Sequence, residues 1–329
     1  MSRATLLSAA FITVALSLTS TSAQTNANEG GRLKQAEALY AKAESFFKEG
    51  RFAEAASGYR EAALLAPEWA KAHNGLCVSR FELGEYEGAA GACRRAAEAE
   101  PDSPQIRLNL GRALKESGRA WEAAEEARVA LRLRPDWAEA HGLLGEIYSD
   151  LGRYEEAAGS FVEALRLDPG DAASLNNLGG VYYKLGRLKE AAASLERAAS
   201  LSPDQPTVHG NLGVVYAEMN LYGRALECYR RALELKPDYA EVYYHAAYAQ
   251  LRLRRYEEAR ASCLRAVELR PDYAEAYQAL GIIYLASGQK GEALRQYKKL
   301  QTLDPALAAP LFKLIYGDKV LDARAYGGQ

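Results

Sequence analysis

Small apolar residues recur along this chain at fixed positions between mixed polar and aliphatic stretches. One such position holds alanine every 34 residues: Ala55, Ala89, Ala123, Ala157, Ala191, Ala225, Ala259 and Ala293. A second position, seven residues later, holds alanine in every case except Leu300, and a third, twelve residues before the first, holds alanine, glycine or cysteine. Small side chains let helix backbones approach closely. The pattern predicts helices that pack in one repeated arrangement.

Prolines follow the same period of 34 residues: Pro67, Pro101, Pro135, Pro169, Pro203, Pro237, Pro271 and Pro305. They divide residues 36–307 into eight units: 36–69, 70–103, 104–137, 138–171, 172–205, 206–239, 240–273 and 274–307. Alanine, leucine, glutamate and arginine dominate the composition, which favours helices over strands. We therefore predict an all-α chain.

The residues in the middle of each unit predict a tight turn between two helices. Six units carry a glycine seventeen residues before the proline: Gly50, Gly84, Gly118, Gly152, Gly186 and Gly288. Glycine there can adopt the left-handed conformation that ends a helix. Asn220 suits the same conformation, whereas Arg254 does not. The aspartates that follow most prolines are predicted to cap the next helix: Asp102, Asp136, Asp204, Asp238 and Asp272.

These units resemble the tetratricopeptide repeat family, whose 34-residue signature combines Leu-Gly, Tyr, Ala, an aromatic residue and Pro. The fourth unit carries this signature as Leu144, Gly145, Tyr148, Ala157, Phe161, Ala164 and Pro169. The second and third units depart from it, with Arg80 and Leu114 in place of the tyrosine. The resemblance implies a right-handed superhelical solenoid of eight helix-turn-helix repeats, with a concave surface lined by the first helix of each repeat.

The two ends of the chain differ from the repeats. Arg3 precedes an apolar stretch of about 15 residues, and Thr21 and Ala23 suit a cleavage site, so we predict a signal peptide over residues 1–23. A membrane-spanning helix needs about 20 apolar residues, which makes an uncleaved anchor the less favoured alternative. The mature chain is thus predicted to be periplasmic or secreted, with no membrane span.

Residues 24–35 are predicted to be a flexible linker. Residues 308–329 are predicted to hold a C-terminal capping helix and a tail, because Leu311, Leu314 and Ile315 follow a helical spacing and Pro310 suits a first turn.

Charge and motifs exclude several classes of function. The 41 basic and 43 acidic residues are evenly spread, so no field attracts nucleic acid. Phosphate-binding loops and HExxH motifs are absent from the sequence. His73, His141 and His209 stand 68 residues apart, two repeats from each other, and so cannot share a metal ion. We predict a chain that is not an enzyme and takes no cofactor, metal or small-molecule substrate.

The four cysteines leave two interpretations open. Cys77 and Cys93 fall at small inward positions on the two helices of one hairpin, where they can form a disulfide or remain buried thiols. Cys228 and Cys263 lie on the second helices of adjacent repeats and are less suited to pairing.

Asparagine recurs at the inward positions of the first helices: Asn74, Asn109, Asn176, Asn177 and Asn211. Because a side-chain amide both donates and accepts hydrogen bonds, such a row can hold an extended peptide by its backbone. The alternative is a local hydrogen-bond network without a ligand. Aromatic and aliphatic residues share these positions at both ends of the repeats, as apolar pockets or as interhelix packing: Tyr40, Phe47, Phe81, Tyr244, Tyr248, Ile282 and Leu285.

Two classes of function follow. The first is an exported scaffold that binds a peptide or protein partner in the concave groove, for example in the assembly of an envelope complex. The second is a structural protein whose terminal repeats stack into homo-oligomers. A carboxylate clamp of the chaperone-adaptor type is not expected, because Tyr40 and Glu44 stand where that clamp needs Lys and Asn.

Overall fold

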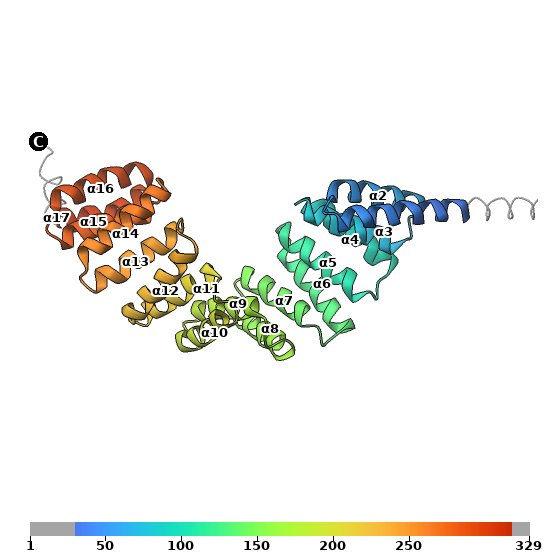
Figure 1. The fold of residues 1–329 in the computed structure, drawn as a ribbon, viewed down its shortest axis with the longest axis horizontal. Coiled ribbons are helices and arrows are strands. Elements are labelled where there is room, and N and C mark those ends of the chain that lie inside the picture. The colour runs from blue at the N-terminus through green and yellow to red at the C-terminus, as the bar shows by residue number, and fades with distance from the viewer. Residues whose placement is uncertain (1–29, 318–329) are drawn as a thin grey trace, which may run out of the picture. The chain divides into compact units, whose positions relative to one another are not determined.

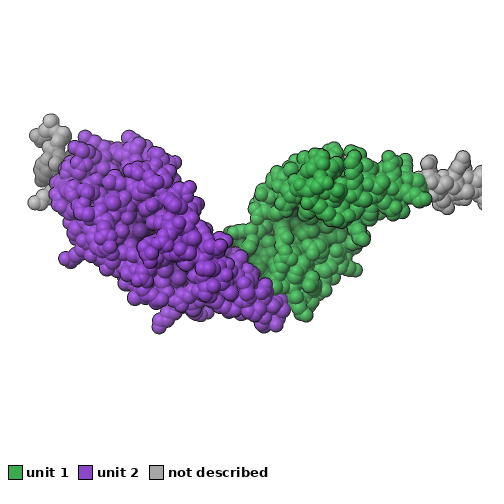
Figure 2. Space-filling view, in the orientation of Figure 1, with its two compact units in different colours: residues 1–153 green, residues 154–329 purple. Residues whose placement is uncertain are grey.

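The computed structural model describes residues 30–317, and within them all regular secondary structure is helical. The chain forms two compact units, unit 1 up to Arg153 and unit 2 from Tyr154 (Figures 1 and 2). The predicted signal peptide, residues 1–23, lies outside the described residues, as do residues 24–29 of the predicted linker.

Unit 1 consists of consecutive helical hairpins. Its first helix includes residues 30–48. The helices that follow are α2 (Phe52–Leu65), α3 (Ala70–Glu82), α4 (Tyr86–Ala99), α5 (Pro104–Glu116), α6 (Ala120–Leu133) and α7 (Ala138–Asp150). Each of the first three repeats therefore supplies a first helix and a second helix, as the sequence predicts, and α7 is the first helix of the fourth.

Unit 2 continues the same order of helices. They are α8 (Tyr154–Leu167), α9 (Ala172–Lys184), α10 (Leu188–Leu201), α11 (Pro206–Glu218), α12 (Tyr222–Leu235), α13 (Ala240–Arg252), α14 (Tyr256–Leu269), α15 (Ala274–Ala286), α16 (Lys290–Leu303) and α17 (Pro305–Tyr316). The prediction of an all-α repeat solenoid is confirmed.

The first helices of neighbouring repeats contact one another within each unit. In unit 1, α3 contacts α5 and α5 contacts α7; in unit 2, α9, α11, α13 and α15 contact one another in sequence. Within each unit, second helices contact the first helices before and after them, for example α4 between α3 and α5, and α12 between α11 and α13. The first helices of neighbouring repeats therefore lie against one another within each unit.

The repeated small positions are buried where helices cross. All eight alanines that stand twelve residues before a proline are fully buried. At the third small position, a Cβ added to Gly179 would lie 2.5 Å from Leu195 Cγ, and one added to Gly213 would lie 2.4 Å from a ring carbon of Tyr229. In these two repeats the small residue on the first helix is thus matched to a large side chain on the second.

The turns between the two helices of a repeat contain a residue in the left-handed region, as predicted. Gly118 has a φ of +79°, and the following Arg119 donates its backbone N–H to Leu114 O over 2.8 Å, which closes the end of α5. Asn220 and Arg254 adopt the same conformation, with φ of 61° and 60°. Arg254 therefore bears the strain of a non-glycine residue at this position.

The predicted helix caps are wrong for the aspartates that directly follow proline. Asp102, for example, lies one residue before the N-cap of α5, which is Ser103, and its register is shared by the four others. Asp171 and Asp304 do occupy N-cap positions, and each accepts two backbone N–H groups. A side-chain cap needs an oxygen on the N-cap residue itself. These aspartates lie one residue before that position, so they do not cap the helix.

Both described ends are more helical than predicted. Residues 30–35, expected in the flexible linker, belong to the first helix. At the other end, α17 begins at Pro305 rather than at residue 308, because Asp304 caps Ala306 N and Leu307 N at 2.9 and 3.0 Å. Pro310 therefore lies inside the helix and not in its first turn. Leu311 and Ile315 are buried against the last repeat, whereas Leu314 is exposed.

No helix within residues 30–317 has both the length and the apolar content that crossing a membrane requires.

Candidate binding surfaces

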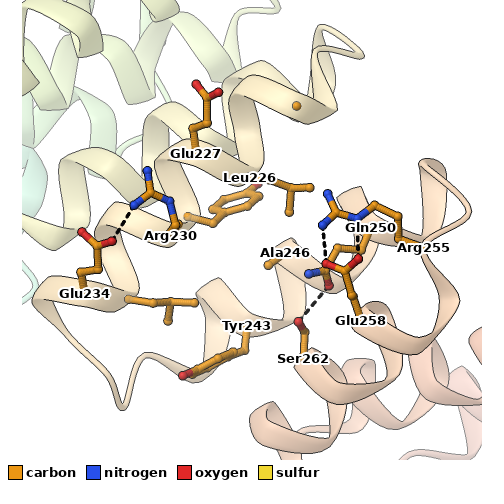
Figure 3. Close-up of a pocket in the computed structure, with 13 residues that line it drawn as sticks. Leu226, Glu227, Arg230, Glu234, Tyr243, Ala246, Gln250, Arg255, Glu258 and Ser262 are labelled. Atoms are coloured by element: carbon orange, nitrogen blue, oxygen red, sulfur yellow. Dashed lines mark hydrogen bonds and ion pairs between the residues drawn. The ribbon is translucent and has the colours of Figure 1, made fainter.

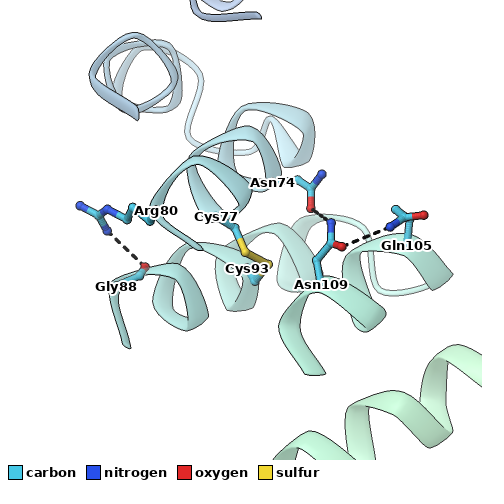
Figure 4. Close-up of a disulfide and its surroundings, with 7 residues drawn as sticks. All are labelled: Asn74, Cys77, Arg80, Gly88, Cys93, Gln105 and Asn109. Carbon is cyan, nitrogen blue, oxygen red and sulfur yellow. Dashed lines mark hydrogen bonds between the residues drawn. A yellow bond between two sulfur atoms is a disulfide. The ribbon is translucent and has the colours of Figure 1, made fainter. Parts of the chain in front are cut away.

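The asparagines predicted to bind a partner in unit 1 form a hydrogen-bonded pair. Asn109 Nδ2 on α5 donates to Asn74 Oδ1 on α3 over 2.9 Å (Figure 4). Gln105, one turn earlier on α5, donates to Asn109 Oδ1 over 3.1 Å. Both asparagines are half-buried.

The asparagines of unit 2 repeat this arrangement. Asn211 Nδ2 on α11 donates to Asn176 Oδ1 on α9 over 2.9 Å, and Asn176 lies 3.4 Å from the amide oxygen of its neighbour Asn177. The structure thus groups the five asparagines into two clusters, one in each unit.

The amide pairs join the first helices of consecutive repeats. A side-chain amide offers two donors and two acceptor lone pairs, and a pair bond takes one donor from one residue and one acceptor from the other. Each pair therefore keeps hydrogen-bonding groups for a ligand while it holds two helices in register. The local network and the peptide-binding role are compatible in this geometry.

Three histidines fix the loops between repeats. Each places Nε2 near the carbonyl oxygen of a proline six residues earlier, and because a carbonyl only accepts, the ring N–H must donate. The distances are 2.7 Å from His73 to Pro67, 3.0 Å from His141 to Pro135 and 2.9 Å from His209 to Pro203. In the part of the chain that the structure describes, no three His, Cys, Asp or Glu residues are grouped to hold a metal ion.

The fourth histidine, His245 on α13, has a different environment. Its ring stacks on Tyr229 at a centroid distance of 6.2 Å and lies 5.2 Å from the ring of Tyr244. Burial lowers the pKa of His245, and the carboxylate of Glu241 opposes this effect only in part.

Cys77 and Cys93 form a disulfide between α3 and α4, with their Cα atoms 5.2 Å apart (Figure 4). These two positions are the ones that Gly179 and Leu195 occupy in the fifth repeat. The disulfide therefore replaces a small-to-large packing contact at the centre of a hairpin. Cys228 and Cys263 remain free thiols, and burial raises the pKa of Cys228 to about 11 and that of Cys263 to about 12.

Most of the aromatic residues at the predicted inner positions take part in packing. Tyr40 contacts the rings of Tyr59 and Trp69 at centroid distances of 5.1 and 4.8 Å. Phe81 packs edge-to-face on Tyr86, the first residue of the following helix. Tyr248 is an exception, because it is exposed and accepts a hydrogen bond from Arg252.

A pocket of about 700 Å³ opens in unit 2 between the second helices α12 and α14, with α13 as its floor (Figure 3). Arg230 pairs with Glu234 at 2.7 Å, and Arg255 pairs with Glu258 at 2.7 Å. Ser262 donates to Gln250 over 2.8 Å across the floor. Both arginines of this pocket are therefore paired with carboxylates, and Glu227 adds a further acidic group to its lining.

A second pocket, of about 580 Å³, opens in unit 1 between α2 and α4, with α3 as its floor. Arg60, Arg80 and Arg95 line it together with Leu64 and other apolar residues, and its lining contains no carboxylate. The walls of both pockets come from second helices, whereas the residues predicted from the sequence to bind a partner lie on first helices. A comparison of equivalent positions among the repeats would have shown the difference in charge.

Helical hairpins joined by left-handed turns, with first helices side by side, define a repeat solenoid of the class that typically serves as a non-catalytic protein-interaction scaffold. Family models described as tetratricopeptide repeat match residues 40–104, 80–147, 143–206, 206–239, 240–273 and 262–295. Together they cover residues 40–295 without a gap. The chain belongs to the tetratricopeptide repeat family.

Solved structures share this fold. A chain of the anaphase-promoting-complex hetero-tetramer Cut9–Hcn1 aligns with 84% of this chain at 19% identity and a TM-score of 0.60, and this chain spans 55% of its length. PilF of Pseudomonas aeruginosa aligns with 64% of this chain and 96% of its own at 25% identity and a TM-score of 0.56. YrrB, described as having an unusual peptide-binding site, aligns with 58% of this chain and 98% of its own at 25% identity and a TM-score of 0.51. No functionally curated protein matches the chain.

Proposed function

We propose that this protein is an exported, non-catalytic scaffold that binds an extended segment of a partner protein along the first helices of each unit. The observation that carries this proposal is the repeated amide pair, Asn109 with Asn74 and Asn211 with Asn176, which presents polar groups at the same position in both units. The unusual peptide-binding site described for YrrB, which has the same fold, supports a peptide partner.

The binding test replaces Asn109 and Asn211 together by alanine. Each hydrogen bond to a ligand contributes about 0.5–1.5 kcal/mol net, so affinity for the partner should fall about tenfold or more. Folding stability should change by less than about 1 kcal/mol, because the remaining amides are accessible to water and alanine is the better helix former.

The partner is first recovered by affinity purification with the wild-type chain and then titrated against purified variants. The control replaces Asn220, which lies in a turn outside both clusters, by glycine. If the folded double variant binds as tightly as the Asn220→Gly control, the amide pairs serve packing only and the proposed peptide contact is wrong.

Export is the second part of the proposal. The signal-like pattern of residues 1–23 supports it, and so does the Cys77–Cys93 disulfide, since disulfides persist in oxidising compartments. In such a compartment the scaffold would hold partners of an envelope complex. Mass spectrometry of the chain from its native cell should find an N-terminus at Gln24 in the extracytoplasmic fraction; an intact Met1 in the cytoplasm would refute export.

Self-association is the competing function, and light scattering coupled to size-exclusion chromatography separates the two. A scaffold of this kind should keep one mass over a wide concentration range. In unit 2, α17 covers the last hairpin through Leu311 and Ile315, which opposes end-to-end stacking there. A mass that grows with concentration would favour the oligomer instead.

A further inference from the structure

The basic pocket of unit 1 lies apart from the asparagine surface. It is formed by residues of α2, α3 and α4, and its walls are the second helices of the first two repeats. Figure 4 shows Asn74 and Arg80 pointing to different sides of α3. A ligand in this pocket therefore need not touch the amide pairs.

The two pockets occupy equivalent positions in the repeats but differ in charge. Arg60 and Arg230 both stand seven residues before the proline of their repeat. At three other equivalent positions, unit 1 either lacks a glutamate that unit 2 has or carries an arginine that unit 2 lacks. They are Leu64 for Glu234, Arg80 for Gln250 and Gly88 for Glu258. One position differs in the opposite direction, with Glu85 for Arg255, but Glu85 does not line the unit 1 pocket. The architecture of the repeat thus provides the cavity, and the sequence of unit 1 makes it cationic.

The arginines of the unit 1 pocket are only weakly neutralised. Arg80 donates to Gly88 O over 3.2 Å and lies 3.6 Å from a carboxylate oxygen of Glu85. Arg60 and Arg95 have neither a hydrogen bond nor an ion pair within the described part of the chain, and both are exposed. Two guanidinium groups therefore remain available for an anionic ligand, and guanidinium binds carboxylates in a bidentate geometry.

The rest of the pocket suits an apolar side chain. Leu64 is 73% exposed at its edge, and Ala63, Leu76 and Ala92 are buried beneath it. A Cβ added to Gly91 would meet nothing within 4 Å, so the wall is open at that point. The adjacent Cys77–Cys93 disulfide connects the floor helix α3 to the wall helix α4 and holds the two in place. A preorganised site of this kind loses less entropy when it binds.

We propose that this pocket binds a segment of a partner protein in which a carboxylate side chain stands beside an apolar one. The carboxylate would lie between Arg60 and Arg95, and the apolar side chain would cover Leu64 and Leu76. A volume of about 580 Å³ suits a few residues of a peptide. The site would give the scaffold a second partner contact, separate from the first-helix surface.

The test uses a display library of random eight-residue peptides selected on the full-length protein. Selection should enrich peptides that pair Asp or Glu with a leucine-like or aromatic residue. A fluorescent copy of an enriched peptide should bind about tenfold more weakly to the Arg60→Gln/Arg95→Gln variant, and binding should weaken as salt screens the charges. Neither arginine has a hydrogen-bond or ion-pair partner within residues 30–317, so the variant should fold normally.

A blocking variant gives an independent readout. Gly91→Trp places a large side chain in the open wall and should abolish binding, whereas Gly223→Trp in the unit 2 pocket, also with nothing within 4 Å, is the matched control. The Asn109→Ala/Asn211→Ala variant should bind the acidic peptide normally, which separates this proposal from the first-helix surface. Three outcomes would overturn the proposal. The selection could yield no acidic motif, the enriched peptide could bind the Gly91→Trp variant as tightly as the wild-type protein, or the protein could bind only phosphatidylglycerol vesicles.

Discussion

Two neighbouring glycines of α9 should respond in opposite directions to the same substitution. Gly179 lies on the face of α9 toward α10, where an added Cβ would be 2.5 Å from Leu195 Cγ. Gly180 is the next residue, and a Cβ there meets nothing within 4 Å. Both residues lie in the helix interior, so alanine gains the same helix propensity at each, and the difference between the variants measures the contact alone.

The magnitudes follow from the structure. Glycine to alanine in a helix interior stabilises by about 1 kcal/mol, which is the expected effect of Gly180→Ala. At Gly179 this gain is opposed by overpacking, which costs about 1–3 kcal/mol. Leu195 has no exposed surface and therefore no room to move away. The Gly179→Ala variant should be about 1–3 kcal/mol less stable than the Gly180→Ala variant.

Urea unfolding followed by circular dichroism at matched conditions measures this difference. A double-mutant cycle with Leu195→Cys isolates the contact, because the seventh repeat combines Ala247 with Cys263 at the same two positions. In the Leu195→Cys background, Gly179→Ala should lose most of its penalty. Equal midpoints for the two single variants, or a penalty that is unchanged in the cycle, would refute the small-to-large matching inferred for this contact.

Three other predictions concern single features. Arg254→Gly should raise the urea midpoint by the equivalent of about 1 kcal/mol, since glycine relieves the left-handed strain; a lower midpoint would contradict that strain. Reduction of Cys77–Cys93 should destabilise unit 1 by about 3 kcal/mol, and a Cys77→Ala/Cys93→Ala variant should melt identically with and without reductant. Because burial lowers the pKa of His245 from 6.5, the unfolded chain takes up its proton first, so stability should fall as the pH drops below 6.5. In a His245→Phe variant this fall should be shallower between pH 7 and 5, and an unchanged slope would argue against the effect.

The repeated hairpin could be predicted from the sequence because its determinants are local. A left-handed turn needs glycine or asparagine within a few residues of the helix end, and the buried alanines follow the period of the repeat. The helix boundaries predicted from the sequence were less accurate than the predicted order of helices. Asp102 and its equivalents stand one residue before the N-cap, whereas Asp304 occupies it and starts α17 three residues earlier than expected. A shift of one residue in the loop changes which side-chain oxygen reaches the backbone N–H groups of the first helical turn. The spacing of residues in the sequence is not accurate enough to predict such a shift.

The eight units, their all-helical character and the positions that must be small can be read from the sequence alone, because each depends on residues close together in one period. The three-dimensional structure was needed to show which residues of different helices contact one another. It joined Asn109 to Asn74 and opened a cationic pocket at Arg60 and Arg95. It also brought the Cα atoms of Cys77 and Cys93 to 5.2 Å, although the sequence left their pairing open. These contacts depend on the distance between packed helices, which the side chains of neighbouring repeats set together.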